Sequence, residues 1–123
     1  MAACRKSEIL IVEDVNDIRE MLCEFFMTHD FRCSGAENGK RAMELFAEKK
    51  FSLIFLNYEL PDTNGYELYK MIRENNKTVP IIFHTPHYKA MRNKIKNDRK
   101  VGFIDKPTLL TTLYDTAMKL LNN

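Results

Sequence analysis

The sequence contains no run of about 18 or more apolar residues, the minimum for a membrane-spanning helix. It also lacks a signal-peptide pattern, because residues 1–7 contain no apolar core segment. Only three cysteines are present, Cys4, Cys23 and Cys33, and no two of them have CxxC spacing. An odd number without that spacing argues against a disulfide framework or a zinc site. We therefore expect free thiols in a reducing compartment, by default the cytoplasm.

Internal repeats, low-complexity stretches and linkers are also missing from the sequence. A chain of 123 residues can bury a sizeable core without disulfides or metals to stabilise it. Its 45% apolar and 29% charged residues are ordinary for a globular protein. We therefore expect one domain over residues 1–123, with a core at 8–121 and no output module attached.

Two short apolar runs, at residues 9–12 and 53–56, are typical of strands that are buried on both faces of a sheet. A weaker, alternating stretch around Cys33 suits a strand at a sheet edge. The predicted strands are residues 8–12, 31–36, 51–56, 79–84 and 101–105. Between them, apolar residues at helical spacing predict helices from residue 14, at 40–50, 66–74 and 90–97, and after residue 108. This alternation predicts an α/β fold with a doubly wound parallel sheet.

Polar residues near the helix starts predict how these helices are capped. Asp14 or Asn16 is expected to cap the first helix and Thr108 the last, because their side chains can accept hydrogen bonds from free amides. The apolar face of the first helix is expected to include Val15 and Met21. Leu109 is expected on the apolar face of the last helix.

Four of the five predicted strands end in residues that could form a site. Glu13 and Asp14 follow the first strand, Asn57 the third, Thr85 the fourth, and Lys106-Pro107 the fifth. In a parallel sheet these ends lie along one edge, which is where open α/β folds bind ligands. The side chains can therefore converge.

Together with the loop Pro61-Asp62-Thr63-Asn64-Gly65, this order of residues resembles the receiver domain of two-component response regulators. The resemblance covers residues 8–121. It implies the flavodoxin-like receiver fold of the chemotaxis regulators, with five parallel strands in the order 2-1-3-4-5 and five helices. It also implies a role in phosphoryl transfer, in which a carboxylate accepts a phosphoryl group beside a divalent ion.

The resemblance assigns roles to the residues at the strand ends. Asp14 would bind Mg²⁺ directly, Glu13 directly or through water, and the backbone carbonyl of Glu59 would be a further ligand. Lys106 would supply a positive charge to the phosphoryl oxygens, and the Thr85 hydroxyl would donate to one of them. Lys106-Pro107 resembles the cis peptide with which the family aims this lysine.

The sequence departs from the family at the phosphoacceptor, where Asn57 replaces an aspartate. An amide is a poor nucleophile and cannot form an acyl phosphate, so Asn57 should not accept phosphate. Its oxygen could still contribute to weak Mg²⁺ binding. Two accounts are open: a natural pseudo-receiver, or a receiver whose aspartate was replaced to keep it unphosphorylated. Pro86, where the family has a small residue, would also restrict Thr85 towards extended conformations.

The segment 89–100 carries a charge of +5 in a chain whose net charge is +2. It is either a solvated helix face or a docking surface for an acidic partner, in which Lys94 and Arg99 would take part. Nucleic-acid binding is less favoured, because no recognition helix or interleaved aromatics accompany the charge. By resemblance, this region binds partners or dimerises, and Phe103 matches the switch aromatic of the family.

The implied partners are a histidine kinase or phosphotransfer protein and an output protein, with the chain itself a monomer or weak homodimer. An alternative function is a metal-dependent phosphohydrolase on a similar sheet. Such enzymes generally need an aspartate nucleophile where this sequence has Asn57, so we expect a signalling module rather than an enzyme. His84 and His87 suggest a metal site, but no third ligand is evident.

Overall fold

The computed structural model describes residues 7–122 and contains five strands that alternate with five helices. The strands are parallel and form one sheet in the order β2-β1-β3-β4-β5, which confirms the predicted fold class. The strands are β1 (Glu8–Val12), β2 (Arg32–Ala36), β3 (Leu53–Leu56), β4 (Ile81–His84) and β5 (Val101–Ile104). The helices are α1 (Asn16–Met27), α2 (Gly39–Glu48), α3 (Gly65–Asn75), α4 (Tyr88–Lys94) and α5 (Leu110–Leu121).

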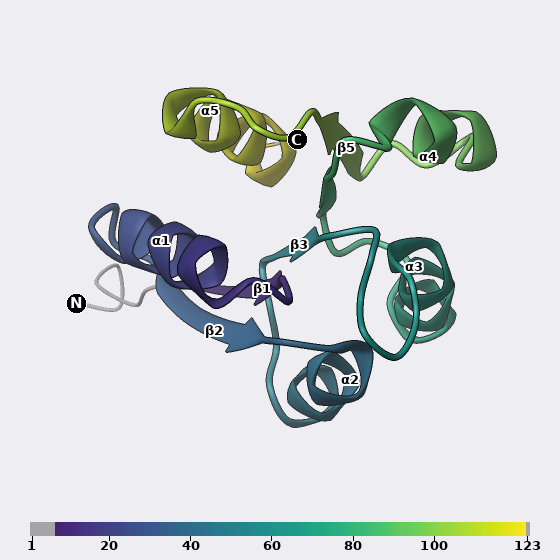
Figure 1. The fold of residues 1–123 in the computed structure, drawn as a ribbon, viewed down its shortest axis with the longest axis horizontal. Coiled ribbons are helices and arrows are strands. Elements are labelled where there is room, and N and C mark those ends of the chain that lie inside the picture. The colour runs from purple at the N-terminus through teal and green to yellow at the C-terminus, as the bar shows by residue number, and fades with distance from the viewer. Residues whose placement is uncertain (1–6, 123) are drawn as a thin grey trace.

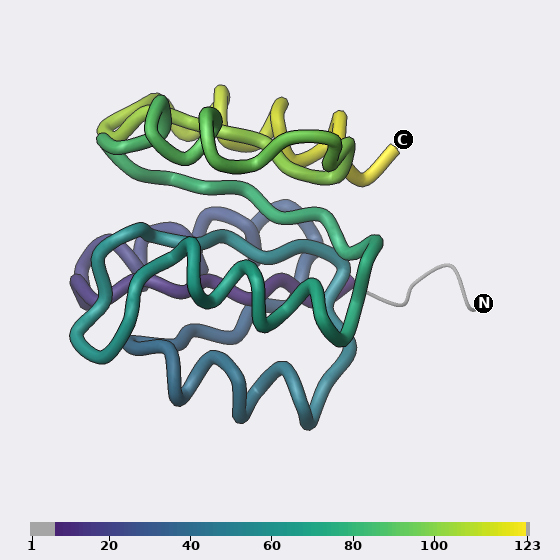
Figure 2. Tube along the Cα trace, turned by 90° about the vertical axis from the view of Figure 1, so that its right-hand side faces the viewer, coloured from purple at the N-terminus to yellow at the C-terminus, as the bar shows by residue number. Residues whose placement is uncertain are grey.

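Helices cover both faces of the sheet, α1 and α5 on one and α2, α3 and α4 on the other (Figure 1). Successive side chains of a strand point to opposite faces, so each strand contributes to both cores. In β3, for example, Phe55 packs towards α1 and α5, whereas Leu56 packs towards α2 and α3. Figure 2 shows α4, β5 and α5 together at one end of the sheet, with α2 at the opposite end.

The predicted edge and centre of the sheet agree with the structure. The strands β1, β3 and β4 are in the centre and are almost completely buried, whereas β2 and β5 form the edges and are partly exposed. Each fully buried Leu, Ile or Phe stabilises the fold by about 1.5–3 kcal/mol. The continuous apolar runs in the central strands therefore supply much of the driving force for folding.

Both predicted helix caps are wrong. Val15 is the N-cap of α1, where neither Asp14 nor Asn16 caps, and the Val15 amide donates to the Glu13 carboxylate at 3.2 Å. Leu109 is the N-cap of α5, and no side chain caps that helix, so Thr108 does not have the predicted role.

Some predicted helix faces and bounds also differ from the structure. Val15, Met21 and Leu109 are 47%, 45% and 73% exposed, although their spacing predicted burial. The fourth helix ends at Lys94 instead of 97, because Ile95 is extended and Asn97 takes a left-handed conformation with φ 64°. None of the helices within residues 7–122 is long and apolar enough to span a membrane.

Candidate functional site

The parallel register brings Glu13 and Asn57 to the same edge of the sheet. Val12 pairs with Leu56 across β1 and β3, so the residues that follow them, Glu13 and Asn57, end these strands side by side. The Asn57 amide donates to the Val12 carbonyl at 3.0 Å, which extends the ladder by one step. Both side chains are buried, with only 2% and 8% exposed. The two polar groups therefore need partners within the protein.

The Asn57 side chain finds its partners among oxygens that the sequence predicted as metal ligands. Its Nδ2 lies 2.8 Å from the Glu59 carbonyl oxygen, 3.1 Å from Asp14 Oδ1 and 3.5 Å from Glu13 Oε2. A backbone carbonyl and carboxylates only accept hydrogen bonds, so the group facing them has to be the NH₂ of the amide. The Asn57 nitrogen thus occupies the point where these three oxygens converge.

Lys106 closes the other side of this cluster. Its Nζ forms an ion pair with Glu13 at 2.6 Å from Oε1 and lies 3.5 Å from Asn57 Oδ1. The Lys106-Pro107 bond is cis, as the resemblance implied. Glu13 Oε2 accepts from the Val15 amide, so both oxygens of this buried carboxylate have donors. This arrangement satisfies a buried charge, which is costly without a partner.

Thr85 follows β4 directly but has no hydrogen bond to this network among the described residues. It is fully buried, and its hydroxyl oxygen accepts the His87 amide at 3.1 Å across Pro86. Within residues 7–122 no hydrogen bond joins Thr85 to Asn57 or Lys106. The structure therefore joins five of the predicted groups in one hydrogen-bonded cluster: Glu13, Asp14, Asn57, Lys106 and the Glu59 carbonyl. Thr85 is not part of this cluster.

His84 is a neighbour of Asn57 whose position the sequence did not predict. Leu56 pairs with Phe83, so His84, the last residue of β4, lies in the register of Asn57. The imidazole is 6% exposed, and neither ring nitrogen has a partner among the described residues. Burial, followed by the nearby Lys106 charge, lowers the His84 pKa to about 4, so the ring is neutral at pH 7. Within residues 7–122 no three His, Cys, Asp or Glu side chains are placed to hold a metal.

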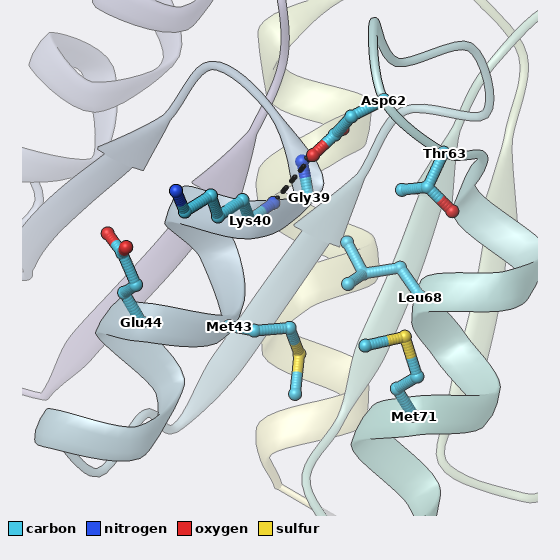
Figure 3. A pocket seen from close by; sticks show the side chains of 8 residues that line it. All are labelled: Gly39, Lys40, Met43, Glu44, Asp62, Thr63, Leu68 and Met71. Carbon is cyan, nitrogen blue, oxygen red and sulfur yellow. Dashed lines mark hydrogen bonds between the residues drawn. The ribbon is translucent and has the colours of Figure 1, made fainter.

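The loop after β3 is fixed by a contact that sequence reasoning missed. Asp62 accepts from the Gly39 and Lys40 amides at 2.8 and 2.9 Å, so it caps the start of α2 from outside the helix (Figure 3). These two hydrogen bonds lower the pKa of the Asp62 carboxyl. Beside it, a cavity of about 510 Å³ between α2 and α3 is lined by Met43, Leu68 and Met71 among others and contains none of the predicted site residues.

The basic segment surrounds α4, and most of its side chains are exposed. Lys94 Nζ lies 5.0 Å from the centre of the Tyr66 ring on α3. The Arg92 guanidinium lies 5.7 Å from the ring of Phe103, which stacks on Phe83 at 5.8 Å between centroids. Arg99 is exposed in the loop between α4 and β5. Phe103 is partly buried, and its ring lies against the Arg92 guanidinium of α4.

Comparison with known proteins finds relatives among two-component signalling proteins. A hybrid signal transduction histidine kinase E of Dictyostelium discoideum is 32% identical in an alignment of 117 residues, which covers 89% of this chain but only 7% of that protein. The two-component response regulator ORR5 of Oryza sativa is 29% identical over 119 residues, with 87% of this chain and 89% of that protein covered.

Solved structures are similar over nearly the whole chain. The response regulator TrrA of Thermotoga maritima, in complex with Mg²⁺-BeF, has a TM-score of 0.82, 29% identity and coverage of 93% of this chain and 98% of that one. The non-phosphorylated HemR receiver domain of Leptospira biflexa has a TM-score of 0.85, 28% identity and coverage of 96% of both chains. The family model of the response regulator receiver domain matches residues 9–117. The chain therefore belongs to the response regulator receiver domain family.

Proposed function

We propose that this receiver domain signals through protein–protein contacts and is not phosphorylated at residue 57. The observation that carries the proposal is the Asn57 amide, which stands at the end of β3 with its nitrogen between Asp14 and the Glu59 carbonyl. An amide lacks the anionic oxygen that attacks phosphorus in the family. Both a natural pseudo-receiver and a receiver with a replaced aspartate would have this chemistry.

The oxygens around Asn57 fit a divalent cation by their chemical nature. The Glu13 and Asp14 carboxylates and the Glu59 carbonyl would hold Mg²⁺, which prefers oxygen ligands. When bound, such an ion offsets negative charge on phosphoryl oxygens. Two features of this chain oppose binding: the Asn57 NH₂ donates to the same three oxygens, and Lys106 already neutralises Glu13. We therefore infer weak Mg²⁺ binding.

The test of the proposed function is incubation with Mg²⁺ and acetyl phosphate, followed by intact-mass measurement. We expect no added phosphate, because residue 57 offers only an amide. A base-labile phosphate that maps to residue 57 would overturn the proposal. Steady release of inorganic phosphate would instead favour a phosphohydrolase, which is why both readouts are taken from the same samples.

Removal of the amide is expected to leave Mg²⁺ affinity unchanged or to raise it. In the structure Asn57 presents its nitrogen to the ligand oxygens, so Asn57→Ala removes a competing donor. Asn57→Asp should bind Mg²⁺ more tightly by roughly 1–3 kcal/mol, because it adds a full negative charge at an effective dielectric near 20. Titration calorimetry on the three proteins measures the order. If Asn57→Ala bound at least tenfold more weakly than the unchanged protein, Asn57 would be a ligand and not a competitor.

We propose that the partners are a histidine kinase or phosphotransfer protein and an output protein with an acidic surface, in line with the family of the chain. The supporting observation is the exposed basic segment around α4, with Lys94 and Arg99 outside and Phe103 partly buried beneath Arg92. Positive charge of this kind steers an acidic surface during encounter, and a buried aromatic ring holds the complex once formed.

Charge reversal in this segment is expected to slow association with the acidic output protein and to flatten the salt dependence of the association rate. The variant is Lys94→Glu with Arg99→Glu, and surface plasmon resonance at several salt concentrations gives the rates. Exposed charges act mainly on the association rate, because salt screens them beyond a Debye length. Phe103→Ala should mainly raise the dissociation rate, since an aromatic anchor contributes by burial.

The matched control is Lys50→Glu with Lys77→Glu, which changes the net charge equally at exposed positions outside the segment. Both double variants should keep their stability within about 0.5 kcal/mol of the unchanged protein. Equal association rates for the two variants would mean that the segment is a solvated face and not a docking surface.

A further inference from the structure

Two cysteines meet where α1 packs against the edge strand β2. Cys23 on α1 and Cys33 on β2 have their sulfur atoms 3.0 Å apart, and both thiols are free and half-buried. This separation lies between an S–S bond of about 2.0 Å and an ordinary non-bonded contact between carbon atoms of about 3.5–4.0 Å. The fold therefore places the two thiols directly against each other.

We propose that Cys23 and Cys33 are a redox modification site, which forms a reversible intramolecular disulfide by exchange with a small disulfide such as oxidised glutathione. The site is independent of residue 57 and of the proposed function. The proposal is supported by the positions of the two sulfur atoms and by the positive charge of Arg19 beside them. Arg19 lies one helical turn before Cys23, at the i, i+4 spacing that places both side chains on one face of α1.

Arg19 also connects this face of α1 to β2 and to the acidic pair. The aliphatic part of its side chain lies against Gly35, where a Cβ would meet Arg19 Cδ at 2.9 Å. The Arg19 guanidinium donates to the Glu13 carbonyl at 2.7 Å. The pair of thiols is thus part of the contact by which α1 is held on the sheet.

The two thiols have different roles in the exchange. The hydrogen bond from Cys33 lowers the pKa of Cys23 despite its burial, and the Arg19 charge acts in the same direction. The same hydrogen bond and burial raise the pKa of Cys33. Cys23 is therefore the attacking thiolate, because the thiolate is the nucleophile in thiol–disulfide exchange.

The reaction balances in two steps. The Cys23 thiolate attacks one sulfur of the small disulfide, the S–S bond breaks, and one small thiolate leaves. Cys33 then loses its proton to solvent and attacks the Cys23 sulfur of the mixed disulfide, which expels the second small thiolate. The protein loses two electrons, and the small disulfide is reduced to two thiols.

The cross-link would join residues 10 apart in sequence and hold α1 on the edge strand. By the loop-closure estimate a ring of this size stabilises the folded state, and we expect the melting temperature to rise by roughly 5–10 °C. This gain requires that the folded geometry accept the bond with little strain. The melting temperature is therefore a direct test of whether the thiols are already in position.

The experiment uses the full chain with Cys4→Ser, so that only the proposed pair can react. The protein is incubated in buffers of reduced and oxidised glutathione, quenched with acid and digested without reductant. We expect a cross-linked peptide that contains Cys23 and Cys33, full reversal by dithiothreitol, and the higher melting temperature in the oxidised sample. Mixed disulfides without the cross-linked peptide, or a cross-link that lowers the melting temperature, would overturn the proposal.

Two single variants test the assigned roles in the same buffers. With Cys33→Ser, the glutathione adduct on Cys23 should accumulate, because the resolving thiol is gone. With Cys23→Ser, Cys33 should react more slowly than Cys23 does in Cys33→Ser, because burial and the nearby Glu8 charge still raise the Cys33 pKa. Equal reactivity of the two single variants would contradict the assignment of Cys23 as the attacking group. Circular dichroism of both variants checks that α1 still packs on the sheet.

Discussion

Replacement of Asn57 by aspartate is expected to turn a chain that takes up no phosphate into one that is phosphorylated close to stoichiometry. The other groups are already gathered around position 57: Glu13, Asp14 and the Glu59 carbonyl face the amide nitrogen, and Lys106 lies near the amide oxygen. The substitution changes one atom and leaves the shape of the side chain almost unaltered. It supplies the anionic oxygen that attack on phosphorus requires.

The variant is incubated with acetyl phosphate as the phosphodonor and with Mg²⁺. An increase in intact mass that hydroxylamine removes identifies an acyl phosphate. A second variant that combines Asn57→Asp with Lys106→Met should label far less, since Lys106 would no longer compensate the phosphoryl charge. This pair of variants separates restored chemistry at residue 57 from adventitious labelling elsewhere. Phosphate that persists at the same level after loss of Lys106 would speak against the assigned role of the lysine.

Failure of the aspartate variant to label, with its fold intact, would mean that the site differs from an active receiver at more than one position. The next candidate would then be the Thr85-Pro86 turn, where the Thr85 hydroxyl accepts the His87 amide. Asn57→Asp with Pro86→Ala tests this directly, because alanine removes the restriction that proline places on Thr85. Labelling that appears only in the double variant would assign the defect to Pro86.

Features that depend on strand period and strand ends could be predicted from the sequence. The run Leu53–Leu56 is apolar on both faces and stops at Asn57. The sequence alone therefore predicts that this strand is buried and that its carboxyl end carries the site. The register also places Glu13 beside Asn57, and the parallel direction of the strands brings Lys106 to the same edge of the sheet. These inferences needed no knowledge of side-chain orientation.

Features that depend on competition between partners could not be predicted. The sequence did not show that the Asn57 side chain turns its nitrogen towards Asp14 and the Glu59 carbonyl. Asp14 was expected to cap α1, but its carboxylate accepts from the Asn57 side chain instead. Asp62 was expected only to form a turn, but it caps α2 across 23 residues of sequence. A local sequence pattern does not show which donor, distant in sequence, will hydrogen-bond to a given acceptor in the folded protein.

The buried arginine on α3 is a further case in which distant partners decide the structure. Arg73 is 8% exposed, and its Nε donates to Asp98 at 2.8 Å. Other guanidinium nitrogens donate to the Val79 carbonyl at 2.8 Å and the Lys100 carbonyl at 3.3 Å. Asp98 also accepts from the Tyr69 hydroxyl at 2.5 Å and from the Lys100 amide at 3.0 Å. This network ties the loop before β5, which carries part of the basic segment, to α3.

Arg73→Met is expected to lower the free energy of unfolding by about 3–5 kcal/mol, which is a large part of the 5–15 kcal/mol of a typical domain. Methionine fills the space but leaves the Val79 carbonyl and much of Asp98 without donors. The matched control is Arg41→Met, whose ion pair with Glu44 is half exposed on both sides and should contribute less than about 1 kcal/mol. Urea denaturation of both variants measures the difference.

The pH dependence of that difference identifies Asp98 as the charge that Arg73 compensates. Burial alone would raise the pKa of Asp98, but the hydrogen bonds from Arg73, Tyr69 and the Lys100 amide outweigh it and lower the pKa below 3.8. A carboxyl with a lowered pKa in the folded state stabilises the protein above its unfolded value and loses that contribution as the pH falls. Arg73→Met loses one of the groups that lower the Asp98 pKa, so Asp98 of the variant takes up its proton at a higher pH than Asp98 of the unchanged protein. The difference in free energy of unfolding between the two proteins should therefore be constant at neutral pH and narrow in acid, once Asp98 of the variant becomes protonated. If Arg73→Met lowered the free energy of unfolding at neutral pH no more than Arg41→Met does, the network would contribute no more than a surface ion pair. Other contacts would then have to hold the basic segment on α3.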